Sequence, residues 1–173
     1  MTKFINAISN TSPLLYLYRI GVIDWLPELF GEIWTPEAVK SELLVGGHKG
    51  YVVPKLSDYS WLQIVNPQSL PSEWLSLDLG PGELAAMSLA IENPDSIVLL
   101  DDMLARRTAR AAGLNVWGTL KVLLELKHQG FIKSIEPFVN QLSDAEMCWF
   151  LFSVYMWVSN EVKHRILVLA GEL

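Results

Sequence analysis

The feature that most constrains the fold is a short apolar segment followed directly by a helical one, and this unit recurs along the chain. The clearest example is SIVLL at residues 96–100, followed by DDMLARRTARAAG at residues 101–113. A strand made only of apolar residues is typical of a parallel strand that is covered on both faces. Strands that alternate with helices therefore predict an α/β fold, with a parallel sheet between two layers of helices.

Five segments are predicted to be strands on these grounds: residues 4–9, 32–34, 61–65, 96–100 and 114–117. The predicted helices are residues 12–20, 22–30, 35–44, 79–93, 101–113 and 118–130, with further helices within residues 134–170. Thr11 or Ser12 is the expected cap of the first helix, and Thr35 is the expected cap of the helix that follows the second strand. GGHKG at residues 46–50 is expected to be a flexible loop.

The length of the chain, 173 residues, is typical of one domain. Residues 1–173 are expected to form a single domain, with about 134–173 as a helical extension packed on it. Hydrophobic residues make up 51% of the chain, which argues against disorder, and the formal net charge is −6. This charge argues against general binding to polyanions. Nucleic acid stays open as a substrate that meets a local basic rim.

Cys148 is the single cysteine, so no intrachain disulfide is expected, which fits a reducing cytoplasm. The N-terminal residues carry no long apolar run, so no signal peptide is expected. The apolar run at residues 147–158 is shorter than the roughly 20 residues of a membrane-spanning helix. We therefore predict a cytoplasmic protein without a membrane segment. SDAEMCWFLFSVYMWV at residues 143–158 is interpreted either as a surface for a second subunit or partner, or as part of the intramolecular core.

Acidic and amide side chains gather where the predicted strands end. Asn10 follows the first strand, and Asp101 and Asp102 follow the fourth. Parallel neighbours end at the same edge of a sheet, where α/β proteins bind their ligands. Glu42 lies beside the buried stripe of its helix, and Glu83 lies in the first turn of another helix, after two glycines. We expect these side chains to meet at one rim.

Each of these acids also has a purely structural explanation. Glu42 alone fits a solvated helix residue, and Glu83 alone fits an acid that stabilises a helix N-terminus. Asp101 fits a helix cap, with Asp102 in the first helical turn. Hard divalent cations such as Mg²⁺, however, prefer a cluster of carboxylate and amide oxygens. Because the acids converge on one rim, the pattern predicts a metal site that can cleave phosphodiesters.

Three arginines, Arg106, Arg107 and Arg110, lie on the helix that follows the aspartate pair. Arg106 and Arg110 are spaced i, i+4 and share a face. One interpretation is a rim that contacts phosphates beside the metal site. The alternative is a solvated face, or ion pairs back to the two aspartates that precede the helix.

Thr119 and Lys121 follow the fifth predicted strand and so belong to the same rim. Thr119 is expected to start a helix, and Lys121 is a weaker candidate for a phosphate contact. The three histidines, His48, His128 and His164, form no pair with the spacing of metal ligands. We expect the histidines to lie at the surface.

Several segments, which together cover nearly the whole chain, share a pattern with a known family. They are ISNTSPLLYL, TPEAVKSELL, LGPGELAAMSLA, VLLDDMLARRTARAAGLNVWGTLKVLLELKHQGFI and MWVSNEVKHRILVLAGE. The chain resembles stand-alone prokaryotic PIN-domain proteins, in particular the subfamily described as predicted nucleic-acid-binding proteins. The resemblance implies a three-layer α/β/α PIN-like fold with a central parallel five-stranded sheet, here with extra C-terminal helices.

The resemblance also implies a ribonuclease centre that depends on Mg²⁺ or Mn²⁺. The acidic positions of the family correspond to Asn10, Glu42, Glu83 and either Asp101 or Asp102, the register between the last two being open. The hydroxyl that often assists at the first of these positions would be Thr11 or Ser12. Asn10 is a departure from the acidic pattern, because an amide oxygen ligates without contributing charge.

Three functions are consistent with these features. The first is a metal-dependent endoribonuclease that acts on single-stranded RNA. The second is a degenerate PIN module that binds RNA or a protein without cleavage, which Asn10 and the acidic net charge motivate. The third is the toxin of a toxin–antitoxin pair, since many PIN proteins are toxins that a small antitoxin inhibits, and many are homodimers.

Overall fold

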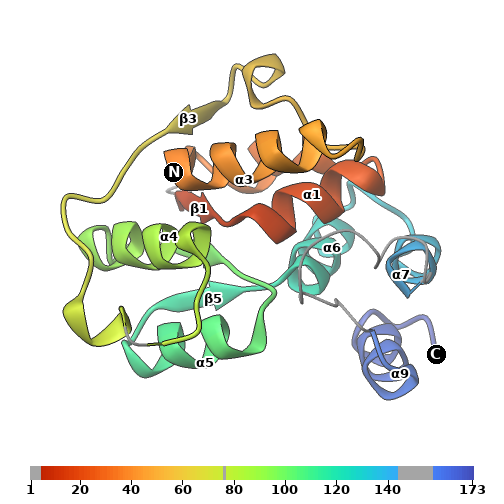
Figure 1. Cartoon of the computed structure of the whole chain (residues 1–173). Coiled ribbons are helices and arrows are strands. Elements are labelled where there is room, and N and C mark those ends of the chain that lie inside the picture. Colours follow the sequence, from red (N-terminus) through yellow and green to blue (C-terminus); the bar gives the residue numbers. More distant parts are fainter. Residues whose placement is uncertain (1–4, 76, 144–157) are drawn as a thin grey trace.

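Five parallel strands form the central sheet, in the order β3-β2-β1-β4-β5 (Figure 1). The computed structural model describes residues 5–75, 77–143 and 158–173. The strands are β1 (Ala7–Ser9), β2 (Ile33–Thr35), β3 (Leu62–Ile64), β4 (Ile97–Leu99) and β5 (Asn115–Trp117). Each overlaps its predicted segment, and all four pairings between neighbours are parallel. The predicted α/β fold with a five-stranded parallel sheet is therefore confirmed.

Helices cover both faces of the sheet. They are α1 (Thr11–Arg19), α2 (Leu26–Leu29), α3 (Glu37–His48), α4 (Pro81–Glu92), α5 (Met103–Ala111), α6 (Thr119–His128), α7 (Glu136–Ser143) and α9 (Asn160–Leu169), with short 3-10 helices at Ile23–Trp25, Leu56–Asp58 and Ser72–Trp74. Successive residues of a strand point to opposite faces. Ala7 and Leu99 accordingly pack with α1, α3 and α6, whereas Ile8 and Val98 pack with α4 and α5. The result is a three-layer α/β/α arrangement.

The strand order places a topological switch point between β1 and β4. From β1 the chain proceeds to β2 and β3 on one side, and it later returns to β4 and β5 on the other. The backbone N–H of Asn10 donates to the carbonyl oxygen of Leu99 at 3.2 Å, so the two strands stay paired up to their carboxyl ends. Ligands of open parallel sheets bind outside these ends. The switch point therefore selects the rim that carries Asn10 and the aspartate pair.

The predicted cap of α3 is wrong. Thr35 is the last residue of β2, and its hydroxyl donates to the carbonyl oxygen of Ser9 at 2.8 Å, tying β2 to β1. The helix begins two residues later, at Glu37, whose backbone N–H donates to Asn66 Oδ1 at 2.8 Å. Because a distant asparagine satisfies the helix start, the local threonine is free for a contact between strands.

The predicted flexible loop at residues 46–50 is also wrong, because α3 continues through both of its first glycines. Gly46 is buried, and a Cβ on Gly47 would lie 3.3 Å from Val53 Cγ2. The absence of side chains thus lets the following chain pack closely against the helix. The turn comes at Gly50, whose φ of +86° is readily adopted by glycine.

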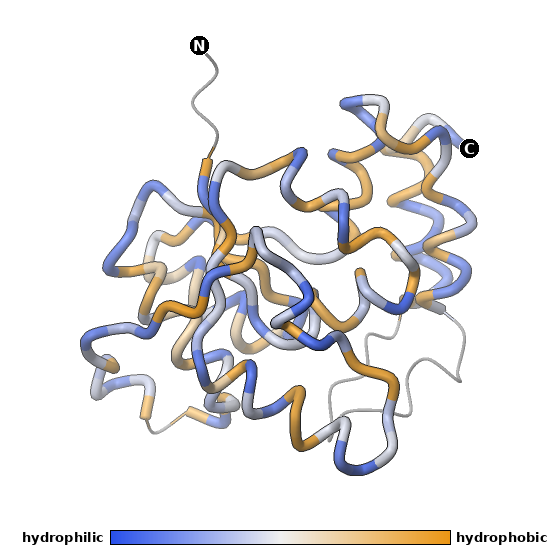
Figure 2. The backbone as a smooth tube through the Cα atoms, turned by 90° about the horizontal axis from the view of Figure 1, so that it is seen from above, coloured by the Kyte–Doolittle hydropathy of each residue, from blue (hydrophilic) through white to orange (hydrophobic). Residues whose placement is uncertain are grey.

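The helices predicted within residues 134–170 are found at α7 and α9, which lie together at one side of the molecule, beyond α6 (Figures 1 and 2). Figure 2 shows hydrophobic and hydrophilic residues alternating there, as expected for helices buried on one side. Cys148 and most of residues 143–158, the segment interpreted as a partner surface or as part of the core, lie outside the described ranges. In the described ranges, no helix is long and apolar enough to span a membrane.

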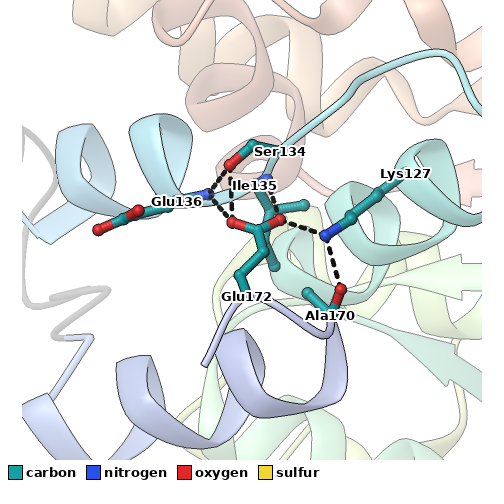
Figure 3. Close-up of polar contacts among 6 residues, drawn as sticks. All are labelled: Lys127, Ser134, Ile135, Glu136, Ala170 and Glu172. Atoms are coloured by element: carbon teal, nitrogen blue, oxygen red, sulfur yellow. Dashed lines mark hydrogen bonds and ion pairs between the residues drawn. The ribbon is translucent and has the colours of Figure 1, made fainter.

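Glu172 fastens this C-terminal region to the rest of the chain (Figure 3). Its carboxylate accepts hydrogen bonds from Lys127 Nζ (2.6 Å), Ser134 Oγ (2.7 Å), Ile135 N (2.7 Å) and Glu136 N (3.0 Å). Burial alone would raise the pKa of Glu172, but these hydrogen bonds lower it to about 2. Glu172 thus connects the end of α9 with α6 and with the N-terminus of α7.

Candidate functional site

Asn10 stands at the carboxyl end of β1 and occupies the N-cap position of α1 with an extended backbone. The predicted caps Thr11 and Ser12 are instead the first two residues of the helix, and both are buried. Asn10 is 3% exposed, and its Oδ1 has no hydrogen-bond donor among the described residues. A buried acceptor without a partner costs about 1–3 kcal/mol. This amide oxygen is therefore a candidate ligand for a cation.

Glu42 reaches the rim from α3 and is held by two donors. The hydroxyl of Thr11 donates to its Oε2, and the backbone N–H of Gly82 donates to its Oε1 at 2.8 Å. A Cβ on Gly82 would lie 2.7 Å from Glu42 Oε2 and 2.9 Å from Asn10 Oδ1, so only glycine fits here. The side chains of Asn10 and Glu42 thus converge on the start of α4, as the sequence predicted.

Glu83, in the first turn of α4, is 9% exposed, and its Oε2 accepts a hydrogen bond from Gly80 N at 2.8 Å. Burial raises the pKa of Glu83 to about 7, against the lowering effect of Gly80 N–H. The negative charges of Asp102, Glu42 and Asp78 raise it further. Burial and the neighbouring charges thus favour the protonated form of this carboxyl group, and a cation at this rim would relieve the repulsion.

The two aspartates after β4 make different contacts. Asp102 is the N-cap of α5 and accepts a hydrogen bond from Ala105 N at 2.8 Å. Asp101 accepts two hydrogen bonds from Thr119, from its N–H at 2.8 Å and from its hydroxyl at 2.7 Å. The explanation with Asp101 as the cap is therefore wrong. Asp102 acts electrostatically on Glu83. Asp101 is instead held by Thr119, which lies two residues beyond the end of β5.

The three arginines of α5 form no ion pair with any described residue. The alternative prediction, that they pair with Asp101 or Asp102, is therefore wrong. Arg107 and Arg110 are exposed, and Arg106 is half-buried. Burial lowers the pKa of the Arg106 guanidinium, as does the charge of Arg110, while Asp101 opposes both. Burial also raises the pKa of Asp101, although Thr119 and Arg106 lower it.

Lys121 is already engaged within the protein. Its Nζ lies 3.3 Å from Glu125 Oε2 and 5.2 Å from the centre of the Trp117 ring. The three histidines, His48, His128 and His164, are exposed and lie on different helices or their ends, so their predicted surface position is confirmed.

The acidic side chains of the rim do not by themselves provide a complete set of ligands for a metal ion. Among the residues that the structure describes, no three His, Cys, Asp or Glu side chains are arranged to hold a metal. The two nearest oxygens around Gly82 come from one carboxylate and one amide. A set of few protein ligands fits Mg²⁺, which keeps several of its waters.

An open cavity of about 690 Å³ lies at the opposite, N-terminal ends of β1 and β4. It is lined by Ile5, Asn6, Trp34, Glu92, Asn93, Pro94, Asp95 and Ser96. None of the residues predicted for the site lines it.

Sequence reasoning missed the backbone groups that hold the two glutamates, namely the N–H groups of Gly80 and Gly82. It also missed the charge of Asp78 near Glu83. The segment LGPGE carried a signal for both N–H groups, because glycines at a helix start let polar groups approach the backbone closely.

A family model described as PIN domain matches residues 6–172, which include every strand of the sheet and every residue of the rim. PIN domains are of nuclease type and generally use divalent metals. No curated protein matches the chain.

Proposed function

This chain belongs to the PIN-domain family, and we propose that it is a metal-dependent endoribonuclease that cuts single-stranded RNA. The observation that carries the proposal is the convergence at the switch point of an unpartnered amide oxygen, Asn10 Oδ1, with the carboxylates of Glu42 and Glu83. Perturbed carboxyl groups that gather in one place are typical of functional sites.

Asn10, Glu42, Glu83 and Asp102 are the proposed ligands of Mg²⁺ or Mn²⁺. The orphaned oxygen of Asn10 and the raised pKa of Glu83 both fit a cation that is bound from outside. When bound, the cation supplies positive charge that acidifies water and offsets the charge of the phosphodiester. Mn²⁺ and Mg²⁺ share a preference for such oxygen ligands.

The residues of the chain prepare this site in distinct ways. Thr11 and the backbone of Gly82 fix the orientation of the Glu42 carboxylate. The raised pKa of Glu83 means that the carboxyl group binds a proton more readily than usual, and it must give up this proton before the rim is loaded. Loading is therefore expected to improve as the pH rises through 7.

RNA is expected to approach from the side of α5. Arg106, Arg107 and Arg110 make no ion pair with any described residue, which leaves their charges for phosphates. Lys121, which is paired with Glu125, is expected to contribute less. A local basic helix of this kind compensates for the acidic net charge of the whole chain.

The experiment is an assay of purified protein with single-stranded RNA and Mn²⁺. Glu42→Gln and Asp102→Asn are expected to lower the rate of cleavage by about 100-fold, the order expected for damage to a metal site. The control is Glu161→Gln, which removes an exposed acid of α9 and leaves the rim untouched. Equal cleavage by Glu42→Gln and Glu161→Gln would contradict the proposal.

A second candidate is a PIN module that binds RNA or a protein without cutting. The uncharged Asn10 favours it, as does the lack of a three-acid cluster among the described residues. Calorimetry with Mn²⁺ separates the two candidates. The non-cutting module predicts undetectable binding by the wild type and a gain with Asn10→Asp, whereas tight binding by the wild type supports the nuclease.

We also propose that the protein acts in the cytoplasm as the toxin of a toxin–antitoxin pair and forms a homodimer. Exposed apolar side chains such as Leu44, Val45 and Val52 support a surface that a partner covers. Growth arrest on expression, relieved by a small protein encoded beside it, would support the toxin role. Light scattering of the purified chain tests the dimer, and a monomer at all concentrations would contradict it.

A further inference from the structure

Arg106 is a cation that the folded chain leaves incompletely paired. Its side chain is half-buried, and its Nε is buried without an acceptor among the described residues. No described carboxylate lies within ion-pair distance of its guanidinium. A buried donor of a charged group is costly to leave unpaired. The side chain is therefore suited to an anion that comes from outside the chain.

Asp101 lies close to Arg106 but does not use its donors. Both oxygens of Asp101 accept hydrogen bonds from Thr119. A Cβ on Gly118 would lie 3.1 Å from Asp101 Oδ1 and 3.2 Å from Arg106 Nη1. The two groups thus stand on the same side of Gly118. The carboxylate favours the charge of the guanidinium while the hydrogen bonds from Thr119 keep it in place.

Arg110 adds a second positive charge one helical turn away. The two guanidinium groups repel each other, and an anion bound between them would remove this repulsion. Arginine forks match the oxygens of a phosphate group in geometry and charge. The subsite lies at the ends of β4 and β5 and follows Asp102 in the sequence, whereas Asn10 and Glu42 come from the end of β1 and from α3.

We propose that Arg106 and Arg110 form a subsite for one phosphate group of an RNA strand, beside the phosphate that is cut. Asp101 and Thr119 are the positioning residues of this subsite, and Asp101 is not a metal ligand. The inference rests on the proposed function for the identity of the strand. It assigns different tasks to the two adjacent aspartates, with Asp102 on the acidic rim and Asp101 on the phosphate subsite.

Binding without metal separates the subsite from cleavage. The probe is a fluorescein-labelled single-stranded RNA with 2′-O-methyl groups, titrated in EDTA at several KCl concentrations and followed by anisotropy. Arg106→Gln is expected to weaken binding about tenfold, and to reduce the slope of log K against log salt by about 0.7, the value for one phosphate contact on a single strand. Arg165→Gln, which removes an exposed charge from α9, is the matched control.

Two further variants distinguish a positioning role from a ligand role. Asp101→Asn is expected to weaken RNA binding in EDTA several-fold while leaving the affinity for Mn²⁺ unchanged. Asp102→Asn is expected to show the opposite pattern. Arg110→Gln, at an exposed position, tests the subsite even if a change at the half-buried Arg106 impairs folding.

The outcomes for the subsite and for the nuclease are distinct. Equal RNA affinities of Arg106→Gln, Arg110→Gln and Arg165→Gln would overturn the subsite, even if the protein cuts RNA. No binding of the probe by the wild type would overturn it as well, as would a loss of Mn²⁺ affinity in Asp101→Asn. RNA binding that depends on Arg106, in a protein that never cuts RNA with Mn²⁺, would support the subsite and contradict the nuclease.

Discussion

The pKa values of two glutamates, the buried Glu83 and the partly buried Glu172, are shifted in opposite directions. At the sheet rim, burial and three neighbouring acids raise the pKa of Glu83 to about 7. At the C-terminus, hydrogen bonds from Lys127, Ser134 and two backbone N–H groups lower the pKa of Glu172 to about 2 (Figure 3). Glu172 thus receives a complete set of hydrogen-bond donors, whereas Glu83 receives an incomplete one.

Glu172 makes a contact that stabilises the fold, and we propose that Glu83 belongs to a site that a ligand completes. Glu172 needs nothing further, because its cation and its N–H donors come from the chain itself. Glu83 receives a single N–H from Gly80, and the orphaned oxygen of Asn10 lies across the same helix start. Unfavourable arrangements of this kind are typical of functional sites.

Cleavage should respond most strongly to a change at Glu83. Glu83→Gln removes the charge that the proposed cation needs, so cleavage of RNA with Mn²⁺ should fall by about 100-fold or more. The fold should be retained, since glutamine keeps the acceptor for Gly80 N–H. Cleavage at the wild-type rate, measured beside Glu161→Gln as the control, would remove Glu83 from the site.

A smaller effect, on stability, is expected at the other glutamate. Glu172→Gln leaves Lys127 Nζ without its ion-pair partner and weakens the hydrogen bonds to α7, which should lower the free energy of unfolding by about 2 kcal/mol. Urea unfolding followed by circular dichroism measures this change. Cleavage per folded molecule should stay the same, and a loss of cleavage without a loss of stability would contradict the purely structural role of Glu172.

The two glutamates should make the free energy of unfolding depend on pH in opposite directions. Glu83 binds its proton more tightly in the folded state, so its contribution is fully present below about pH 4.5 and is lost as the pH rises towards 7. Glu172 contributes above about pH 4.5 and loses its contribution as the pH falls towards 2. Asp101, whose pKa is also raised, acts in the same sense as Glu83.

Urea unfolding of the wild type and of Glu83→Gln at pH 4.5, 5.5, 7 and 8 tests this dependence. The variant should lose less stability than the wild type between pH 4.5 and 7. Parallel curves for the two proteins over that range would show that Glu83 does not titrate as described.

The sheet and the position of the rim were predictable from the sequence, because apolar runs identify buried parallel strands and their ends fall at one edge. The helix caps were not. Thr35 resembles a cap locally, but its hydroxyl bonds to Ser9 of the neighbouring strand, while Asn66 satisfies the helix start. A hydroxyl chooses between local and tertiary partners only once the chain has folded.

The same limit explains why the register of the aspartate pair stayed open. What separates Asp101 from Asp102 is Thr119, which is 18 residues away from Asp101 along the chain and reaches it across the end of the sheet. The role of Glu172 could not be predicted from the sequence either, because its partners come from α6 and from the start of α7.

Calorimetric titration with Mn²⁺ at pH 6 and pH 8 tests the central claim, that the rim around Glu83 is the part of the molecule prepared for a cation. The wild type should bind more tightly at pH 8, by up to about tenfold, because the proton on Glu83 no longer competes. Glu172→Gln should behave like the wild type, and Glu83→Gln should bind weakly with little dependence on pH. Equal binding by the wild type and Glu83→Gln at both pH values would contradict the claim.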